Sequence, residues 1–385
     1  MIAMNYRGPQ RIRVDRDTPM PEILHPQDAI VRVTRACICG SDLHLYNGNV
    51  PDTRVGETFG HEFIGVVEEI GSDVTKLKVG DQVIVPFNIA CGECTFCEQE
   101  LYSCCHEANP QATAAGGIFG YSHMTGGYNG GQAEYVRVPY ANVGPMVIPE
   151  GMHPDDAVLL TDVVPTGYHA AEMGGIQKGD TVVVFGAGPV GIMAAKSAWL
   201  FGAGRVIVFD KEEYRLDFVR KYAQCEAYNF LSISDPVVFM KKTTDSLGAD
   251  VCIDAVGAEA SGSKLQTVTG RKTLMQAGSA TALQWAINSV KKGGVVSIVG
   301  VYGPTVNMVP IGNAVNKGVT IRGSQTSVKR LLPKLVKHVQ DGILDPKAII
   351  THHIPLEEVA DGYRIFADKL DNCIKPVLVP PSANI

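Results

Sequence analysis

Four cysteines lie close together in the first half of the chain, at Cys91, Cys94, Cys97 and Cys105. Their spacing, C-x2-C-x2-C-x7-C, allows four thiolates to surround one Zn²⁺ ion and leaves no coordination position for water. Such a site stabilises the fold and takes no part in chemistry. We predict a structural zinc site, because the segment is too polar for an apolar core; a 4Fe–4S cluster is the alternative. Cys104 could also be the fourth ligand.

A second set of metal-binding residue types precedes this cluster. Cys39-Gly-Ser41-Asp-Leu-His44 is followed further along the chain by Gly60-His61-Glu62. A cysteine, a histidine and acidic groups brought together can hold a second zinc ion with one open position, where an alcohol oxygen can bind and its pKa fall. A histidine after a glycine commonly serves a turn or a core, so each piece alone is weak. The pattern predicts a catalytic metal only together with the following nucleotide motif.

A glycine-rich motif, Gly186-Ala-Gly188-Pro189-Val190-Gly191, directly follows the apolar run Thr181–Phe185. Glycines at these positions permit a tight turn, close approach of the backbone to a pyrophosphate and tight packing of a helix on a strand. The pyrophosphate would lie at the helix N-terminus, where free N–H groups favour an anion. Asp210 ends the next expected strand, where a carboxylate can accept from the ribose hydroxyls and repel a 2′-phosphate. The motif predicts NAD over NADP, although Lys211 could soften that discrimination.

The composition describes a globular protein with two domains. Its 385 residues are 45% hydrophobic and 19% charged, and the chain is too long for one compact core. The net charge of -6, without a long run of Lys and Arg, makes nucleic acids and anionic membranes poor partners. The longest apolar stretch, Val182–Ala195, is too short to span a bilayer. The first residues lack a secretory signal, so we expect a cytoplasmic protein whose ten cysteines serve metals and not disulfides.

The first 150 residues contain short β-branched runs separated by turn residues, a pattern typical of a small barrel or sandwich. After about Gln325 we expect helices and a last strand at Lys375–Val379, which returns to this first domain. The strands expected in the first part are Ala29–Thr34, Phe63–Ile70, Gln82–Pro86 and Ala133–Val138.

From Asp180 onward, apolar strands alternate with helical segments, which indicates a parallel sheet with helices on both faces. The expected elements are strands at Thr181–Phe185, Arg205–Asp210, Val251–Val256 and Gly294–Gly300, and helices at Pro189–Leu200 and Glu213–Ala223. Ala258–Leu283 fits neither type, and we expect a long, partly helical insertion there. The predicted domains are 1–153 with 325–385, and 154–324.

Together these residues resemble the zinc-containing medium-chain alcohol dehydrogenase superfamily, over nearly the whole chain. In detail the chain is most similar to the branch of glutathione-independent formaldehyde dehydrogenases and formaldehyde dismutases. The resemblance implies an α/β protein with a GroES-like β-rich catalytic domain, a doubly wound Rossmann domain that binds NAD, and an active site in the cleft between them. The stretches that carry the closer match are Val85-Pro-Phe-Asn-Ile-Ala-Cys91-Gly, Gly130-Gly-Gln-Ala-Glu-Tyr-Val136 and Thr161-Asp162-Val-Val-Pro-Thr166-Gly-Tyr-His169.

The resemblance also implies the zinc ligands. The catalytic zinc would be held by Cys39, His61 and a third residue at the start of the Rossmann half. Most alcohol dehydrogenases use a cysteine there. This sequence has none in that segment and offers Asp162, as the formaldehyde dehydrogenase branch does; a helix N-cap is the alternative role. The family spacing selects Cys105 over Cys104 as the fourth structural ligand, which gives two zinc ions per chain.

Further roles follow from the same resemblance. Ser41 and His44 match a proton relay from the zinc-bound oxygen through a ribose hydroxyl to solvent, which hydride transfer from a neutral alcohol requires. Glu62 would support the ligands or bind the metal transiently while water exchanges for substrate. Thr166 would pack near the nicotinamide, and the backbone of Val299–Val301 would hold its carboxamide.

We interpret the chain as a zinc- and NAD-dependent oxidoreductase that interconverts alcohols and aldehydes or ketones by hydride transfer at a zinc-polarised oxygen. By family analogy it would be a homotetramer or a homodimer. Formaldehyde dehydrogenase or dismutase is the narrower option, in a branch that retains its nicotinamide through turnover. Ala258–Leu283 would then cover the adenosine end of NAD and slow its release.

Three alternatives stay open. The regions Leu45–Asn47 and Val315–Gln325 do not follow the formaldehyde branch closely, so an ordinary alcohol dehydrogenase is compatible with the sequence. A polyol or threonine dehydrogenase is a further option. From another class, the chain could be a redox-silent NAD-binding protein that keeps only its structural zinc, although the presence of Cys39, His61 and Asp162 argues against this.

Overall fold

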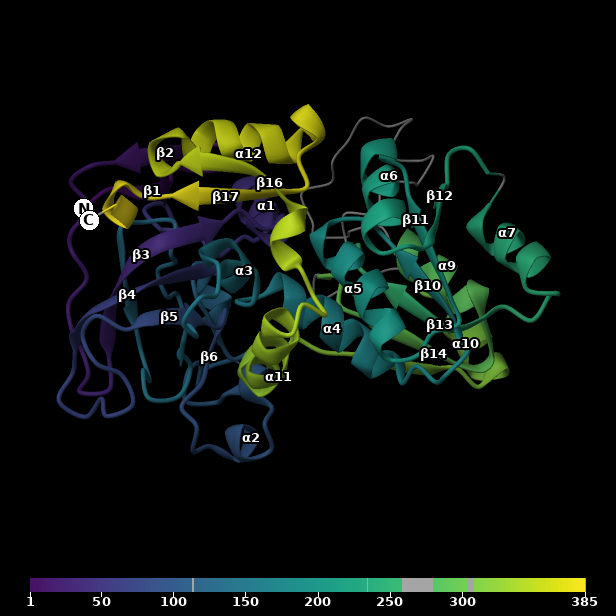
Figure 1. Ribbon diagram of the computed structural model, residues 1–385, viewed down its shortest axis with the longest axis horizontal. Coiled ribbons are helices and arrows are strands. Elements are labelled where there is room, and N and C mark those ends of the chain that lie inside the picture. Colours follow the sequence, from purple (N-terminus) through teal and green to yellow (C-terminus); the bar gives the residue numbers. More distant parts are fainter. Residues whose placement is uncertain (113, 234, 258–279, 303–307, 385) are drawn as a thin grey trace. The chain divides into compact units, whose positions relative to one another are not determined.

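The computed structural model describes every residue except 113, 234, 258–279, 303–307 and 385. The chain divides into two compact units (Figure 1). The first unit comprises Met1–Pro165 and Gln325–Ile385, and the second comprises Thr166–Ser324.

The first division of the chain therefore follows Pro165, later than the expected position after residue 153. The reason is the helix α3 (Pro154–Leu159), which packs on strands β3 (Ala29–Cys37) and β4 (Phe63–Ile70) of the first unit. Its apolar residues from Ala157 to Leu159 are fully buried there. The sequence change near Pro154 marks the start of this helix, whereas the chain passes to the second unit within α4 (Val163–Gly174).

The first unit contains a seven-stranded sheet with the order β16-β17-β3-β4-β5-β9, in which β8 also pairs with β3. Its remaining strands are β1 (Ala3–Tyr6), β2 (Ile12–Asp15), β5 (Gln82–Val85), β6 (Asn88–Ile89), β7 (Gly117–Ile118), β8 (Tyr135–Val138), β9 (Met146–Val147), β16 (Ile350–Pro355) and β17 (Lys375–Val379). Its other helices are α1 (Gly40–Tyr46), α2 (Thr95–Glu98), α11 (Val328–Gln340) and α12 (Val359–Ala367).

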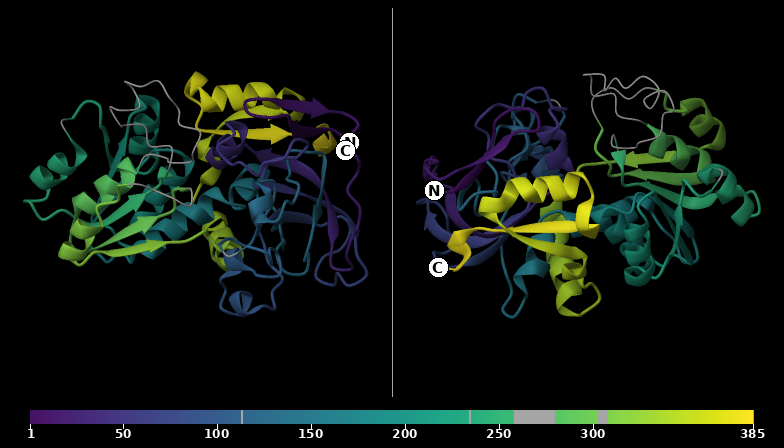
Figure 2. Two further views of the ribbon diagram at one scale, coloured as in Figure 1. Left: turned by 180° about the vertical axis from the view of Figure 1, so that it is seen from behind. Right: turned by 90° about the horizontal axis from the view of Figure 1, so that it is seen from above.

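The C-terminal tail completes this sheet. Strand β17 pairs antiparallel with β3, with Val377 opposite Cys37, and parallel with β16. Helix α12 packs on both C-terminal strands (Figure 2). The tail thus belongs to the first unit, as expected, and two distant stretches of sequence build one core.

The second unit is a parallel sheet of six strands with the order β12-β11-β10-β13-β14-β15. The strand order reverses between β10 (Thr181–Phe185) and β13 (Ala249–Asp254), so the predicted doubly wound architecture is confirmed. Its remaining strands are β11 (Arg205–Asp210), β12 (Glu226–Asn229), β14 (Val290–Ile298) and β15 (Thr320–Gly323), and its helices include α5 (Pro189–Leu200), α6 (Glu213–Tyr222), α7 (Pro236–Thr243), α9 (Thr281–Ser289) and α10 (Ile311–Lys317).

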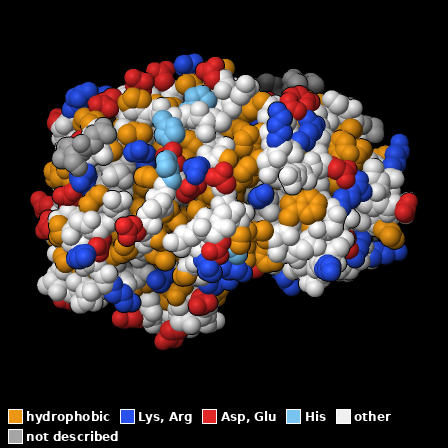
Figure 3. All heavy atoms as spheres, viewed as in Figure 1, with side chains coloured by type: hydrophobic (Ala, Val, Ile, Leu, Met, Phe, Trp, Pro, Cys, Tyr) orange, Lys and Arg blue, Asp and Glu red, His pale blue; other side chains and the backbone are white. Residues whose placement is uncertain are grey.

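Acidic and basic side chains are interspersed on the visible face of each unit (Figure 3). In the part of the chain that the structure describes, every helix is too short or too polar to cross a membrane. All ten cysteines are free of disulfide bonds. Most of the predicted insertion, residues 258–279, lies outside the described residues.

Candidate metal centres and nucleotide site

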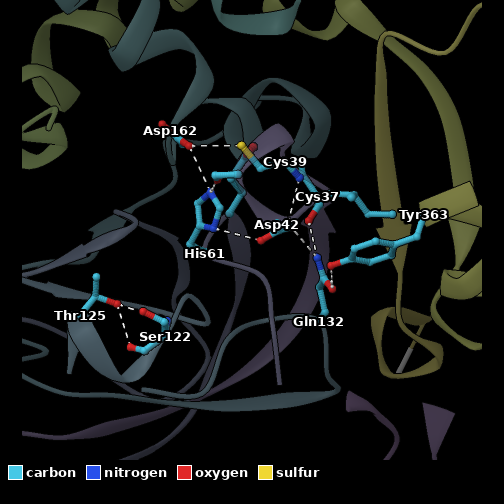
Figure 4. Close-up of polar contacts among 12 residues, drawn as sticks. Cys37, Cys39, Asp42, His61, Ser122, Thr125, Gln132, Asp162 and Tyr363 are labelled. Atoms are coloured by element: carbon cyan, nitrogen blue, oxygen red, sulfur yellow. Dashed lines mark hydrogen bonds and ion pairs between the residues drawn. The ribbon is translucent and has the colours of Figure 1, made fainter. Parts of the chain in front are cut away.

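Four potential metal ligands converge in the first unit: Cys39, His61, Glu62 and Asp162 each offer a donor atom within 4.8 Å of the others. Cys39 immediately precedes α1, the pair His61-Glu62 precedes β4, and Asp162 precedes α4. Figure 4 shows the side chains of Cys39, His61 and Asp162 pointing toward one another. The fold thus brings together all three residues that the resemblance assigned to the catalytic zinc.

The distances within this group suit a shared small cation. The Asp162 Oδ2 atom lies 3.3 Å from His61 Nε2 and 3.9 Å from Cys39 Sγ. Ser41 Oγ lies 3.3 Å from the same His61 nitrogen, which places the expected relay hydroxyl beside the centre. His44 is half-buried in the last turn of α1.

A carboxylate that sequence reasoning missed orients His61. Asp42 is fully buried, and its Oδ1 lies 3.3 Å from His61 Nδ1. Its Oδ2 accepts from the backbone N–H of Cys39 at 2.9 Å and from Gln132 Nε2 at 3.2 Å. Metal-binding histidines usually donate their second ring nitrogen to such a carboxylate. Its place three residues after Cys39 is the signal that could have identified it.

The electrostatics of His61 favour positive charge at this point. Burial alone would lower the pKa of the imidazole, but the charge of Asp42 and the hydrogen bonds that the ring makes with Asp162, Asp42 and Cys39 raise the pKa well above its ordinary value. The same negative groups would stabilise a bound dication. Gly60, with φ of +99°, precedes His61 in a close turn that only glycine suits, because a Cβ there would lie 2.5 Å from Gln132 Cγ.

A second buried residue that the sequence did not reveal is Lys375. Its Nζ lies 2.6 Å from Glu62 Oε1 and donates to the Ile38 carbonyl at 3.3 Å. Both side chains are almost fully buried, at 1% and 0% exposure. Glu62 Oε2 has no hydrogen-bond partner among the described residues. A lysine at the start of the otherwise apolar strand β17 was the available signal.

These observations test whether a zinc ion fits. Sulfur, imidazole nitrogen and carboxylate oxygen are all ordinary zinc ligands. The donors are buried, they converge, and Asp42 supports the histidine. An unpaired, buried Glu62 oxygen would itself be costly without a cation or another partner nearby. The residues present therefore fit the metal.

The four-cysteine group also converges. The donor atoms of Cys91, Cys94, Cys97 and Cys105 lie within 4.8 Å of one another. Backbone N–H groups point at the sulfurs, with Cys91 N 3.2 Å from Cys105 Sγ. Cys104 instead contacts the Ser103 hydroxyl, with 4.0 Å between sulfur and oxygen, so the geometry favours Cys105 as the fourth donor.

The glycine motif has the geometry of a phosphate-binding turn. Gly188 is the N-cap of α5, and Pro189 and Val190 form its first turn. Gly186 has φ of +98°, and a Cβ on Gly191 would lie 1.9 Å from the Gly186 carbonyl oxygen. Neither position therefore tolerates a side chain, and free backbone N–H groups are left at the helix start.

Asp210 braces this turn from the end of β11. Its Oδ2 accepts from Ala187 N at 2.6 Å, and its Oδ1 accepts from the N–H groups of Lys211 and Glu212 at 2.6 and 3.0 Å. The contact of Asp210 with the ribose stays a prediction beside this structural role. Val299 and Val301 follow β14 at the same edge of the sheet as the glycine turn, and Thr166 lies in α4.

Comparisons with known proteins agree with this architecture. Residues 25–150 match the alcohol dehydrogenase GroES-like domain, and residues 189–281 match the zinc-binding dehydrogenase family. The zinc-type alcohol dehydrogenase-like protein AdhB of Bacillus subtilis is 44% identical over 99% of this chain and 100% of its own length. A glutathione-independent formaldehyde dehydrogenase of Pseudomonas aeruginosa is 38% identical over 77% of this chain and 74% of its own.

Among solved structures, the alcohol dehydrogenase TADH from Thermus sp. ATN1 superposes with a TM-score of 0.83. It is 33% identical, and the match covers 99% of this chain and 100% of the other. The chain therefore belongs to the zinc-containing medium-chain alcohol dehydrogenase superfamily and is a zinc- and NAD-dependent oxidoreductase that acts on alcohols and aldehydes.

Proposed function

We propose that Cys39, His61 and Asp162 hold the catalytic zinc, and that Cys91, Cys94, Cys97 and Cys105 hold the structural one. The convergence of the first three residues on one buried point carries this proposal. A bound zinc ion would act as a Lewis acid toward the substrate oxygen. NAD would supply the hydride acceptor.

The protein's own residues would position the reactants and move the proton. Asp42 keeps the His61 ring in place through Nδ1. Ser41 Oγ, beside His61, would take up the substrate hydroxyl proton and pass it toward His44 and solvent. Glu62, held at Oε1 by Lys375, would keep its second oxygen directed at the metal donors and assist ligand exchange.

On the nucleotide side, Gly186, Gly188 and Gly191 would admit the pyrophosphate to the start of α5. Asp210 would bind the adenosine ribose, and Thr166 with the Val299–Val301 backbone would bind the nicotinamide. The substrate class we favour is formaldehyde or another small aldehyde and its alcohol, by similarity to the glutathione-independent formaldehyde dehydrogenases. We also propose a cytoplasmic location, which the ten free thiols suit.

Metal content tests the ligand assignment. Wild-type protein should hold two zinc ions per chain, and Asp162→Ala should hold one and lose more activity than the ~10–100-fold cost of mutating a residue that only supports a ligand. Ser41→Ala is the matched control, because it should slow turnover and keep both metals. A single zinc ion in the wild type would instead indicate a redox-silent protein with only the structural site.

Acid denaturation of freshly purified protein tests the narrower proposal. Near-stoichiometric NAD and NADH in the supernatant would indicate a nucleotide that stays bound through turnover, as in the formaldehyde branch. An empty supernatant would indicate an exchanging co-substrate and an ordinary alcohol dehydrogenase.

A further inference from the structure

Asp254 is a buried carboxylate to which neither the motif nor the comparisons assign a role. It ends β13, and its side chain is 0% exposed. Strand β13 lies next to β10 at the point where the strand order of the second unit reverses. Open α/β sheets bind dinucleotides in the crevice at such a point, beyond the carboxyl ends of the strands.

Asp254 connects two segments at this edge, the turn after β13 and the segment after β14. Its Oδ2 accepts from the Tyr302 hydroxyl at 2.5 Å. Its Oδ1 accepts from the backbone N–H groups of Val256 and Gly257 at 3.0 and 3.1 Å. The Asp254 carbonyl oxygen accepts in turn from the N–H of Val299 at 3.0 Å. One residue thus fixes both the turn after β13 and the strand end after β14.

These two segments are in direct backbone contact. A Cβ on Gly257 would lie 2.4 Å from the Val301 carbonyl oxygen, and a Cβ on Gly300 would lie 2.2 Å from Gly257 N. The turn after β13 also reaches the glycine motif, because a Cβ on Gly186 would lie 2.7 Å from Val256 Cγ2. The turn after β13 thus lies against both the Val299–Val301 backbone and the glycine motif.

The direction of the dinucleotide follows from the strand order. The pyrophosphate belongs at the Gly186–Gly191 turn after β10, and Asp210 lies on the β11 side of it. The other nucleotide half would then extend to the opposite side, over the ends of β13 and β14. Asp254 ends β13, and Tyr302 follows β14.

We propose that Asp254 and Tyr302 are positioning residues for the nicotinamide half of NAD. The hydrogen bond between them holds the Val299–Val301 backbone where it can bind the nicotinamide, and the adenosine half does not depend on it. This inference rests on the proposed NAD site. Tyr302 packs against the apolar core of the second unit, so its ring stays supported when the hydroxyl is removed.

The test compares NAD with ADP-ribose, which shares the adenosine half and the pyrophosphate and lacks nicotinamide. The Tyr302→Phe protein is loaded with zinc, freed of bound nucleotide and titrated with NAD in a calorimeter. Its dissociation constant for NAD should be about fivefold higher than that of the wild type, the effect of one lost hydrogen bond. The constant for ADP-ribose should change less than about twofold. Tyr228→Phe is the matched control, since Tyr228 donates to Glu226 Oε2 at 2.8 Å in the edge strand β12 of the same sheet.

Each outcome has one meaning. Selective loss of NAD affinity in Tyr302→Phe, with Tyr228→Phe unchanged, supports the positioning role. Equal weakening of both ligands, or no change in either, overturns it, because a general structural role would not discriminate between them. Failure of the wild type to bind either ligand would overturn the NAD site itself and this inference with it. Thermal melts of the three proteins confirm that the variants are folded.

Discussion

The polar residues buried around the candidate catalytic centre occur in complementary pairs. Glu62 pairs with Lys375, and His61 pairs with Asp42. A buried ion pair contributes little net stability, but removal of one partner leaves an uncompensated charge. These residues are therefore more sensitive to single substitutions than the exposed ion pairs of the same unit.

Lys375→Met should lower the free energy of unfolding by about 3–5 kcal/mol, because Glu62 would lose its partner in the interior. Urea denaturation at equal zinc content measures the effect. Lys347→Met is the control, since its ion pair with Asp156 is partly exposed, with the lysine 47% accessible, and its loss should cost much less. Similar losses in the two variants would contradict the expectation.

Single residues also show where sequence reasoning stops. Cys39 and His61 could be predicted as ligands only from the family resemblance, whereas the four cysteines and the glycine motif stood out by their spacing. Lys375 and Glu62 could not be paired, because the contact joins residues far apart in sequence. Asp254 could not be distinguished in the sequence from any other aspartate at the end of a strand, because its hydrogen bond with Tyr302 joins residues far apart in the chain.

At the level of elements, strong apolar patterns were sufficient. Strands β4, β10, β11 and β17 and helix α5 begin and end at the predicted residues, since turn residues flank each run. The β14 strand begins earlier than the expected Gly294, at Val290, because its lysines and glycines conceal the extended start. The helix α3 was missed, and with it the position of the domain boundary.

The two edge strands of the parallel sheet differ in how they are protected. At one edge, Arg205 of β11 donates to both carboxylate oxygens of Glu226 in β12, from Nε to Oε1 at 2.6 Å and from Nη2 to Oε2 at 2.9 Å. At the other edge, all four residues of β15 are exposed, and the large apolar side chains of Met308 and Val315, which precede β15 in the chain, are 85% and 73% exposed. Exposed apolar edges commonly serve as pairing surfaces.

For the homotetramer or homodimer that the family analogy leads us to expect, β15 is therefore the edge at which two copies would pair about a twofold axis. Ile321→Lys should shift the protein toward the monomer in light scattering, because it places a charge within that strand. Leu231→Lys, at a leucine beyond β12 that is more exposed than Ile321, should leave the assembly unchanged. A wild type that is monomeric at micromolar concentration would refute the proposal.

The ion pair between Arg205 and Glu226 leads to a prediction about how the stability of the fold depends on pH. The hydrogen bond from Arg205 holds the pKa of Glu226 below its ordinary value, and Tyr228 adds to the effect. Since the folded-state pKa is lowered, the stabilisation is complete above the unfolded-state value of about 4.3 and is lost as the pH falls through the folded-state pKa. Both partners are about one-third exposed, so the contribution should stay below about 1 kcal/mol.

Urea denaturation of wild type and Glu226→Gln at several pH values measures this contribution. The two proteins should differ near neutral pH and converge in acid. Asp217→Asn, which removes an exposed pair with Arg220 on α6, serves as the control and should differ little from wild type throughout. A gap that widens as the pH falls would contradict the assigned sign.

At the scale of the whole molecule, the two units differ in continuity. The second unit is one stretch of chain with its own apolar core, whereas the first combines Met1–Pro165 with Gln325–Ile385. An isolated fragment of residues 163–324, which keeps α4 intact, should unfold cooperatively in urea by circular dichroism. A fragment of residues 1–165 should not, because β3 would lack its partner β17. Equal cooperativity of the two fragments would refute this.

This discontinuity has a consequence for synthesis on the ribosome. Domains generally fold as units while the chain emerges. The second unit is complete in the nascent chain once Ser324 has emerged, before the tail that closes the first unit exists. Lys375, which pairs with Glu62, belongs to that tail and is added only after the second unit. The metal centre is therefore completed later than the second unit, although its four donor residues all precede Pro165.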